Sequence, residues 1–256
     1  MSGSKFKQYA PQTGTYSVKV KTGSNWRDFN TCRLQVSVGQ PYHEGEKFQA
    51  TMNWVSERFE NIILCVNDTL QRYNTLAENP ALSEDQSAVL WNKMGSEWIE
   101  RNSVYFSSAT NCTIYRWDDW ILSPEYEERH NQVMNFFSTN ANFRSSIQKN
   151  VMDFWHRKAM KDGQHSIESQ LSFIQQSERY LLEETAVFAM MFQKHNAVDI
   201  YPGTTLLPAT LFRGNPVPGM PEGLDKGAFT RIDFGRNQQK IRPLMAQDLH
   251  TPSIAA

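Results

Sequence analysis

Residues 33–43 read Arg-Leu-Gln-Val-Ser-Val-Gly-Gln-Pro-Tyr-His. Apolar residues occupy every second position from Leu34 to Val38, and this period of two predicts a short strand. The glycine and proline that follow break the strand, and the apolar spacing over 45–59 predicts a helix. A strand, a turn and a helix begin an α/β unit, in which ligands bind beyond the carboxyl ends of the strands. Ser37 lies at that end, either as an ordinary strand-end serine or as a hydroxyl group placed for chemistry.

Strand and helix patterns continue to alternate along the chain. Further strands are expected over 61–67, 112–117 and 198–201. Helices are expected over 83–102, 124–137, 140–161 and 166–194. Ser83 and Gln86 match the capping-box pattern at the start of the first of these helices. This order predicts an α/β fold, a single Rossmann-like domain whose mainly parallel sheet is flanked by helices.

Polar segments flank the predicted domain on both sides. Residues 1–30 are polar and predict an N-terminal arm, with one edge strand over 15–21. The predicted domain then covers 31–212. Residues 213–256 contain five prolines and five glycines, and they predict an extended tail.

The composition limits the classes of partner and cofactor. The formal net charge of −1 gives no overall attraction for nucleic acid, so any polyanion must be held by a local basic patch. The sequence contains no glycine-rich phosphate loop and no metal-ligand spacing, and Cys32, Cys65 and Cys112 are expected to be reduced thiols. We therefore predict neither a metal nor a cofactor. Without an apolar leader-like or membrane-length run, we expect a cytoplasmic protein with no membrane partner.

A tyrosine and a glutamate lie one helical turn apart in the last predicted helix. Tyr180 and Glu184 are spaced i and i+4, so they share one face. The apolar residues around them, from Leu181 to Met191, indicate a largely buried helix. A partly buried carboxylate beside a phenol can bind an amine or move a proton. The spacing alone favours the simpler alternative, a surface pair on an amphipathic helix.

Five stretches together resemble one known family, the cyclodipeptide synthases. They are 36–42, 53–59, 123–126, 180–184 and 199–202, and their order and spacing also match. The resemblance extends from about residue 32 to about residue 208. It implies a fold like the catalytic domain of the class I tyrosyl- and tryptophanyl-tRNA synthetases. It also implies an enzyme that joins two aminoacyl-tRNAs into a cyclodipeptide without ATP.

The resemblance assigns roles to individual residues. It implies that Ser37 is the nucleophile of a ping-pong mechanism and carries the first aminoacyl group as an ester. Tyr180 and Glu184 are implied to hold the amino group of the substrate. Tyr201 is implied to assist proton transfer, and Tyr126 to line the site.

Three marker positions divide the family into two branches. Here they read Gln40, Tyr201 and Pro202. This combination resembles the branch that has any residue at the first position, followed by Tyr and Pro.

By the same resemblance, a pocket beside the serine holds the first aminoacyl side chain. Its lining residues here are Arg33, Gln35, Trp117, Val187 and Asp199. Alternation places Arg33 and Gln35 on the strand face of Ser37. Buried charges must be paired, so either Arg33 and Asp199 pair with each other or they meet a polar substrate. We predict a polar or ionisable first residue, such as Glu, His or Arg, in preference to Leu or Phe.

Some members of the family bind tRNA through an arginine-rich helix at the position of residues 84–102. Here that segment holds Lys93 and Arg101 against four acidic residues. A second basic group follows at Arg144, Lys149, Arg157, Lys158 and Lys161. This group is the candidate tRNA-binding surface. Its spacings do not all share one helix face, and a solvated surface without a partner is the alternative.

Two other functions remain open beside the synthase. One is an enzyme that transfers a single aminoacyl group to a small molecule or peptide, and the other is a non-catalytic tRNA-binding module. The presence of Ser37, Tyr180, Glu184 and Tyr201 argues against the module. The expected partners are aminoacyl-tRNAs and not DNA, and the expected state is a monomer.

Overall fold

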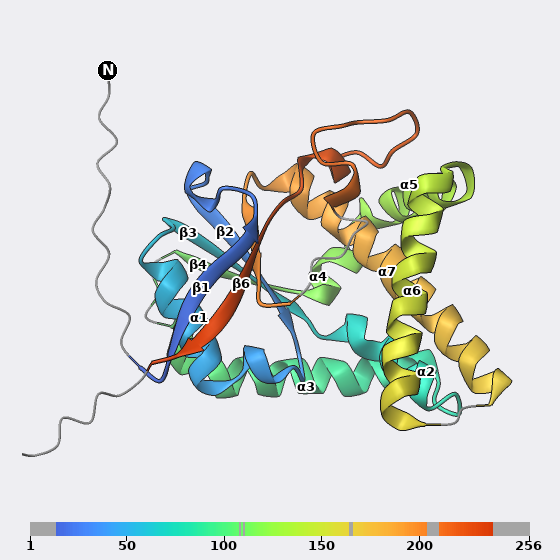
Figure 1. Cartoon of the computed structure of the whole chain (residues 1–256), viewed down its shortest axis with the longest axis horizontal. Helices are drawn as coiled ribbons and strands as arrows, with labels where there is room; N and C mark the ends of the chain where they lie inside the picture. Colours follow the sequence, from blue (N-terminus) through green and yellow to red (C-terminus); the bar gives the residue numbers. More distant parts are fainter. Residues whose placement is uncertain (1–13, 108, 110, 164–165, 204–209, 238–256) are drawn as a thin grey trace, which may run out of the picture.

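The computed structural model describes residues 14–107, 109, 111–163, 166–203 and 210–237. Its strands are β1 (Tyr16–Gly23), β2 (Thr31–Ser37), β3 (Asn61–Asn67), β4 (Cys112–Arg116), β5 (Val198–Tyr201) and β6 (Ala228–Arg236). They form a six-stranded sheet in the order β1-β6-β5-β2-β3-β4 (Figure 1). Neighbouring strands from β6 to β4 pair in parallel, and β1 pairs antiparallel with β6. The predicted α/β fold with a mainly parallel sheet is confirmed.

Helices connect the strands and flank the sheet (Figure 1). The α-helices are α1 (Gly45–Ser56), α2 (Arg72–Glu78), α3 (Glu84–Phe106), α4 (Trp117–Ile121), α5 (Tyr126–Thr139), α6 (Ala141–Asp162) and α7 (Ile167–Lys194). The 3₁₀ helices are η1 (Trp26–Asp28), η2 (Pro41–His43), η3 (Thr69–Gln71) and η4 (Leu224–Lys226). The predicted capping box forms at the start of α3, between Ser83 and Gln86. In the described part of the chain, no helix has the length and apolar character needed to cross a membrane.

Alternate residues of β2 face two different helical layers. Leu34 belongs to a hydrophobic cluster that includes residues of α1 and α3. Arg33 and Gln35 face the other way and reach Met191 of α7. A second cluster, built by α2 and α4 to α7, has the buried half of α7 at its centre. The polar residues of β2 are therefore buried beneath α7.

The sheet extends beyond the domain boundaries predicted at residues 31 and 212. β1 lies in the predicted polar arm, where the sequence indicated an edge strand. β6 lies in the predicted tail, but it pairs in parallel with β5 and buries Ala228, Thr230 and Ile232. The prolines and glycines that suggested an extended tail are concentrated between 214 and 227, before this strand begins. The rest of the predicted arm and tail, 1–13 and 238–256, lies outside the described residues.

Candidate active site

The turn after β2 fixes the position of Ser37. This serine is the last residue of β2, at the carboxyl ends of the parallel strands. Its carbonyl oxygen accepts a hydrogen bond from the N–H of Gln40 at 3.2 Å. Gly39 has a φ of +88°, a left-handed conformation that favours glycine, and Pro41 begins η2. The chain therefore turns sharply and leaves Ser37 at the open edge of the sheet.

A buried histidine holds the backbone of the same turn. The N–H of Ser37 donates to Nδ1 of His43 at 2.8 Å. Burial lowers the pKa of His43 to about 4, so its ring is neutral near pH 7. Nε1 of Trp98 donates to the carbonyl oxygen of His43 at 2.9 Å and ties the turn to α3. Sequence analysis did not single out His43, because its contact depends on the shape of the turn.

A row of hydroxyl groups begins at the serine. Ser37 Oγ lies 3.3 Å from the hydroxyl oxygen of Tyr201, which lies 2.9 Å from that of Tyr42. Burial raises the pKa of both phenols, so both tyrosines are neutral near pH 7. Such a row can pass a proton to or from the serine. Tyr42 was not among the predicted site residues.

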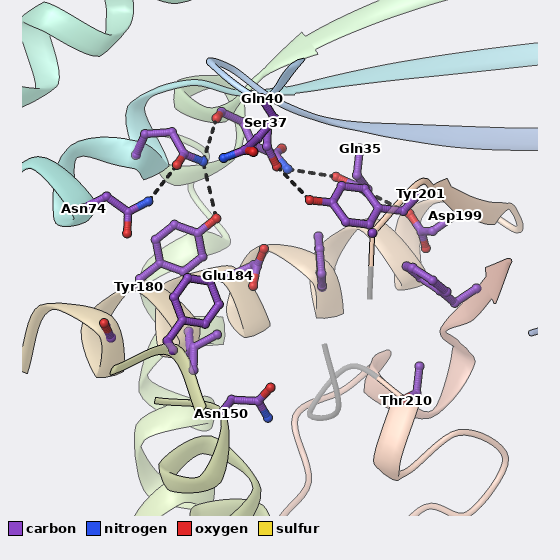
Figure 2. A pocket seen from close by; sticks show the side chains of 18 of the residues that line it. Gln35, Ser37, Gln40, Asn74, Asn150, Tyr180, Glu184, Asp199, Tyr201 and Thr210 are labelled. Carbon is purple, nitrogen blue, oxygen red and sulfur yellow. Dashed lines mark hydrogen bonds between the residues drawn. The ribbon is translucent and has the colours of Figure 1, made fainter. Parts of the chain in front are cut away.

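A pocket of about 560 Å³ lies beside these hydroxyl groups (Figure 2). Ser37, Gln40 and Tyr201 line one side of it, and Tyr180 and Glu184 of α7 line another. A pocket of this size suits a small-molecule group with several polar contacts. The structure therefore brings the four predicted catalytic residues into one site.

Glu184 has an unusual environment in this pocket. Its side chain is buried, and its Oε2 has no hydrogen-bond partner among the described residues. Burial raises the pKa of this carboxyl group to about 8, so it is protonated near pH 7 while the pocket holds no cation. Tyr180 beside it accepts a hydrogen bond from Gln71 Nε2 at 3.4 Å. These contacts exclude the surface-pair alternative and leave a site suited to a cationic amine.

The charges beside Ser37 neutralise each other. Arg33 donates from Nε to Asp199 Oδ1 at 3.0 Å and from a terminal nitrogen to Oδ2 at 2.9 Å. Gln35 Nε2 also donates to Asp199 Oδ1, at 2.7 Å. The internal pair is therefore the alternative that the structure adopts. These charges no longer favour an ionisable first substrate residue over Leu or Phe.

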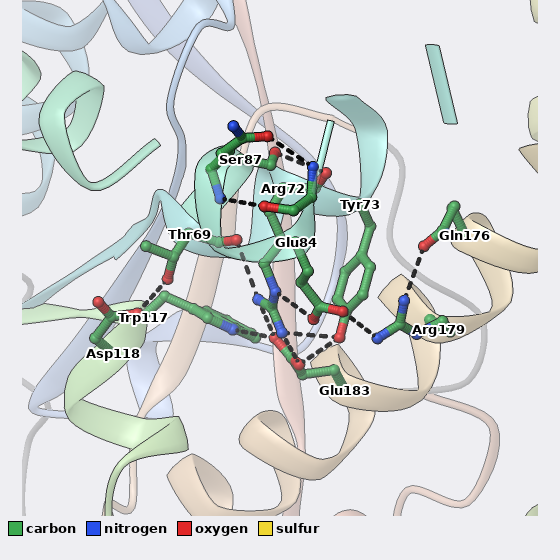
Figure 3. A network of polar contacts seen from close by, with 12 residues as sticks. Thr69, Arg72, Tyr73, Glu84, Ser87, Trp117, Asp118, Gln176, Arg179 and Glu183 are labelled. Carbon is green, nitrogen blue, oxygen red and sulfur yellow. Dashed lines mark hydrogen bonds and ion pairs between the residues drawn. The ribbon is translucent and has the colours of Figure 1, made fainter. Parts of the chain in front are cut away.

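Three residues predicted to contact the substrate do not line this pocket, and Figure 3 shows one of them, Trp117, beside Glu183. Trp117 donates from Nε1 to Glu183 Oε1 at 2.7 Å, and the hydroxyl of Tyr126 donates to Glu183 Oε2 at 3.4 Å. Val187 is fully buried in the hydrophobic cluster around α7. Glu183 and Val187 are spaced i and i+4 on α7, and neither lines the pocket that Tyr180 and Glu184 line. Of the predicted first-residue pocket, Gln35 and Asp199 line the observed pocket and Arg33 does not. The marker residue Pro202 does not line it either.

The predicted basic surface is mostly engaged within the protein. Arg144 donates to the carbonyl oxygens at the end of α5, Lys149 pairs with Asp153, and Lys158 pairs with Glu78. Arg157 extends over the ring of Phe154 and is the member that lines the pocket. Lys161 is exposed near the end of α6.

Polar amides complete the pocket and were missed by sequence analysis. Asn67 ends β3, Gln71 ends η3, and Asn74 and Asn150 come from α2 and α6. Asn67 lies at the carboxyl end of a parallel strand, and that position was a usable signal. Within the described residues, no group of three or more His, Cys, Asp or Glu side chains is placed to hold a metal ion.

Comparison with known proteins gives structural matches only. No protein-family model and no curated protein matches the sequence. The fold is similar to a cyclodipeptide synthase from Fluoribacter dumoffii, with a TM-score of 0.71, 24% identity, and coverage of 85% of this chain and 99% of that one. It is also similar to a cyclodipeptide synthase from Candidatus Glomeribacter gigasporarum bound to Phe-tRNAPhe, with a TM-score of 0.62, 15% identity, and coverage of 87% and 93%.

A third similar structure is a Mycobacterium tuberculosis protein described as demonstrating that cyclodipeptide synthetases are related to type I tRNA synthetases. Its TM-score is 0.61 at 13% identity, with coverage of 89% of this chain and 97% of that one. At such identities the likeness establishes the fold.

Proposed function

We propose that this protein is a tRNA-dependent cyclodipeptide synthase that works through an aminoacyl-enzyme on Ser37. One observation carries the proposal: a strand-end serine lines the same pocket as a buried carboxyl group whose Oε2 has no hydrogen-bond partner among the described residues. The first can accept an acyl group, and the second can hold the amine of that acyl group. The likeness to solved cyclodipeptide synthases supports the same conclusion.

The first half-reaction transfers one aminoacyl group to the enzyme. Ser37 Oγ attacks the ester carbon of an aminoacyl-tRNA, the bond to the ribose oxygen breaks, and the tRNA leaves. The proton of Ser37 passes to the departing ribose oxygen, with the terminal hydroxyl of the tRNA as a relay. The N–H groups of Ser37 and Gln40 are already bonded within the turn, so other N–H groups of this turn must receive the oxyanion.

The second half-reaction forms two amide bonds. The amine of a second aminoacyl-tRNA attacks the ester on Ser37, which releases the serine hydroxyl and gives a dipeptidyl-tRNA. Tyr180 and Glu184 hold the first amino group until it attacks the remaining tRNA ester. That attack closes the ring and frees the second tRNA. Tyr201 assists the proton transfers, because its hydroxyl lies 3.3 Å from Ser37 Oγ.

The proposal also specifies the branch of the family, the substrates and the cellular location. Gln40, Tyr201 and Pro202 support the X-Tyr-Pro branch. Aminoacyl-tRNAs are the substrates, so the enzyme would act in the cytoplasm, as a monomer, in the biosynthesis of a secondary metabolite. No cofactor is needed, because the ester of an aminoacyl-tRNA is already activated.

One assay separates the synthase from its two alternatives. The protein is incubated with a full set of charged tRNAs, and the products and the intact protein are analysed by mass spectrometry. A synthase gives cyclodipeptides and an acylated protein, a single-transfer enzyme gives linear products, and a binding module gives neither. Ser37→Ala is expected to abolish both the acylated protein and the product. Product formation by Ser37→Ala at the rate of the unmodified protein would refute the nucleophile assignment.

A further inference from the structure

Two buried acceptor atoms in the pocket lack a hydrogen-bond partner among the described residues. They are Glu184 Oε2 and Asn67 Oδ1. The side chains are 5% and 2% exposed, and both residues line the pocket. The other unpartnered buried polar atoms of the described chain belong to residues that do not line it. Buried acceptors are normally satisfied, so this pair indicates a ligand that donates hydrogen bonds.

The orientation of the Asn67 amide follows from a buried charge. Asp199 only accepts hydrogen bonds, so Gln35 must turn its Nε2 toward it, at 2.7 Å. The Oε1 of Gln35 then faces Asn67 and accepts from its Nδ2 at 3.3 Å. Inverting either amide would place two donors or two acceptors against each other. The Arg33–Asp199 pair therefore fixes the Asn67 amide with Nδ2 bonded to Gln35 and with Oδ1 available to a ligand.

A glutamine links Asn67 to the amine-binding face of α7. Gln71 Nε2 donates to the backbone oxygen of Asn67 at 3.2 Å and to the hydroxyl oxygen of Tyr180 at 3.4 Å. Tyr180 lies one turn before Glu184 on the same face of α7, and Figure 2 shows both residues on the wall of the pocket. Asn67 and Glu184 thus belong to two adjoining walls.

We propose that Asn67 Oδ1 is a further ligand of the substrate's α-ammonium group, beside Glu184 and Tyr180. The Arg33–Asp199 pair would then act through Gln35 to present that oxygen, so Gln35 is a positioning residue. This inference rests on the proposed function, which supplies an amino group to the pocket. An ammonium has three donors and no acceptor, which matches a carboxylate, an amide oxygen and a phenol oxygen.

Equilibrium binding of unreactive probes tests this assignment. The probes are phenylalaninamide, leucinamide and serinamide, each compared by calorimetry with the same compound lacking the α-amino group. The unmodified protein is expected to prefer the amino compounds. Asn67→Ala should reduce this preference about tenfold or more, as expected for a hydrogen bond to a charged group.

A double-mutant cycle tests the positioning by Gln35. Gln35→Met removes the contact that orients Asn67, so it should reduce the preference for the amino compound. In the Asn67→Ala background the same change should have no further effect on the preference. Asn102→Ala is the control, because it truncates another buried asparagine, 1% exposed, that does not line the pocket. Thermal unfolding of every variant separates a local change from a loss of fold.

The outcomes distinguish this inference from the proposed function. An unchanged preference in Asn67→Ala, or no preference in the unmodified protein, overturns the role of Asn67. Additive effects of Gln35→Met and Asn67→Ala overturn the positioning by Gln35. If the preference depends on Asn67 but charged tRNAs give no cyclodipeptide, the synthase proposal fails while the amine site stands. If cyclodipeptides form and Asn67→Ala keeps the preference, the synthase stands without this ligand.

Discussion

Glu184 is a buried carboxyl group whose protonation differs between the folded and the unfolded chain. Burial raises its pKa from the usual 4.5 to about 8. The folded protein therefore holds this proton more tightly than the unfolded chain does, and the resulting stabilisation is complete below about pH 4.5. It is lost as the pH rises toward 8. Within that window, this group should lower the free energy of unfolding by about 1 kcal/mol per pH unit.

Glu184→Gln is expected to remove this pH dependence. Glutamine keeps the shape of the side chain but does not ionise, so the variant should gain stability over the unmodified protein as the pH rises through this window. Urea unfolding at a series of pH values measures the difference. Glu168→Gln, which makes the same change at an exposed position in the first turn of α7, is the matched control. A constant difference between Glu184→Gln and the unmodified protein would contradict the raised pKa.

Because Arg33 and Asp199 form a buried ion pair, substitution of either residue is expected to destabilise the protein. Arg33 is 0% exposed, and Asp199 is 2% exposed. Asp199→Leu leaves the guanidinium buried without its counter-ion, which is expected to cost about 3–5 kcal/mol in urea unfolding. Arg33→Met combined with Asp199→Leu should recover most of this loss, because no unpaired charge remains. A fully stable Asp199→Leu with a new amino acid preference would instead assign Asp199 to substrate recognition.

The family resemblance selected Ser37, Tyr180 and Glu184, and the structure brings all three to one pocket. Strand-end position agreed with the choice of Ser37, whereas helical spacing alone favoured a surface pair for Tyr180 and Glu184. The pairing of Arg33 with Asp199 depends on the register of β2 against β5, where the two residues lie directly opposite each other. That register joins residues far apart in the chain, so composition and spacing could leave the pair open but could not decide it.

Two adjacent glutamates of α7 have opposite surroundings. Successive helical residues are about 100° apart, so Glu183 and Glu184 face different sides. Glu183 accepts from Arg72 at 2.8 Å, from the hydroxyl of Tyr73 at 2.8 Å and from Trp117 Nε1 at 2.7 Å (Figure 3). It thereby joins α2 and α4 to α7. Glu184 is the residue left for a ligand.

Glu183→Ala is therefore expected to destabilise the packing of several helices. The substitution leaves Arg72 with Glu84 as its remaining carboxylate partner and leaves the buried Nε1 of Trp117 without its acceptor, at a cost of about 3 kcal/mol. Urea unfolding measures the loss, and Glu168→Ala at the exposed start of α7 should cost less than about 1 kcal/mol. The contrast with Glu184→Gln is the critical result, because near pH 8 that variant should be more stable than the unmodified protein. Equal effects of the two substitutions would refute the assignment of these faces.

Periodic elements were predicted well because their signals are local. The strand over 61–67 and the helix over 166–194 agree with β3 and α7 to within one residue at each end. β6 was missed because the prolines and glycines before it dominate the composition of the segment. This strand pairs with β1 and with β5, and β1 lies far away in the sequence.

At the scale of the whole molecule, the proposed tRNA binding would depend on local charge. The formal net charge of −1 provides no general attraction for a polyanion. Lys149 and Lys158 form ion pairs, and Arg144 caps α5, so most of the predicted basic surface is already neutralised or buried in contacts. Arg157 and Lys161 form no ion pair with any described residue, and Arg157 lines the pocket that we propose receives the aminoacyl end.

We expect Arg157→Ser combined with Lys161→Ser to weaken tRNA binding and its dependence on salt. Binding releases fewer counterions for each phosphate contact that is lost. The slope of log K against log salt should therefore become shallower by about 1 per contact. Filter binding or fluorescence anisotropy with a charged tRNA over a range of salt concentrations measures both quantities. Lys19→Ser combined with Lys21→Ser on β1 is the matched control, because it removes the same charge from a strand that lies away from α6 (Figure 1). If the control lowers the slope and the α6 variant does not, the tRNA lies along the β1 edge of the sheet.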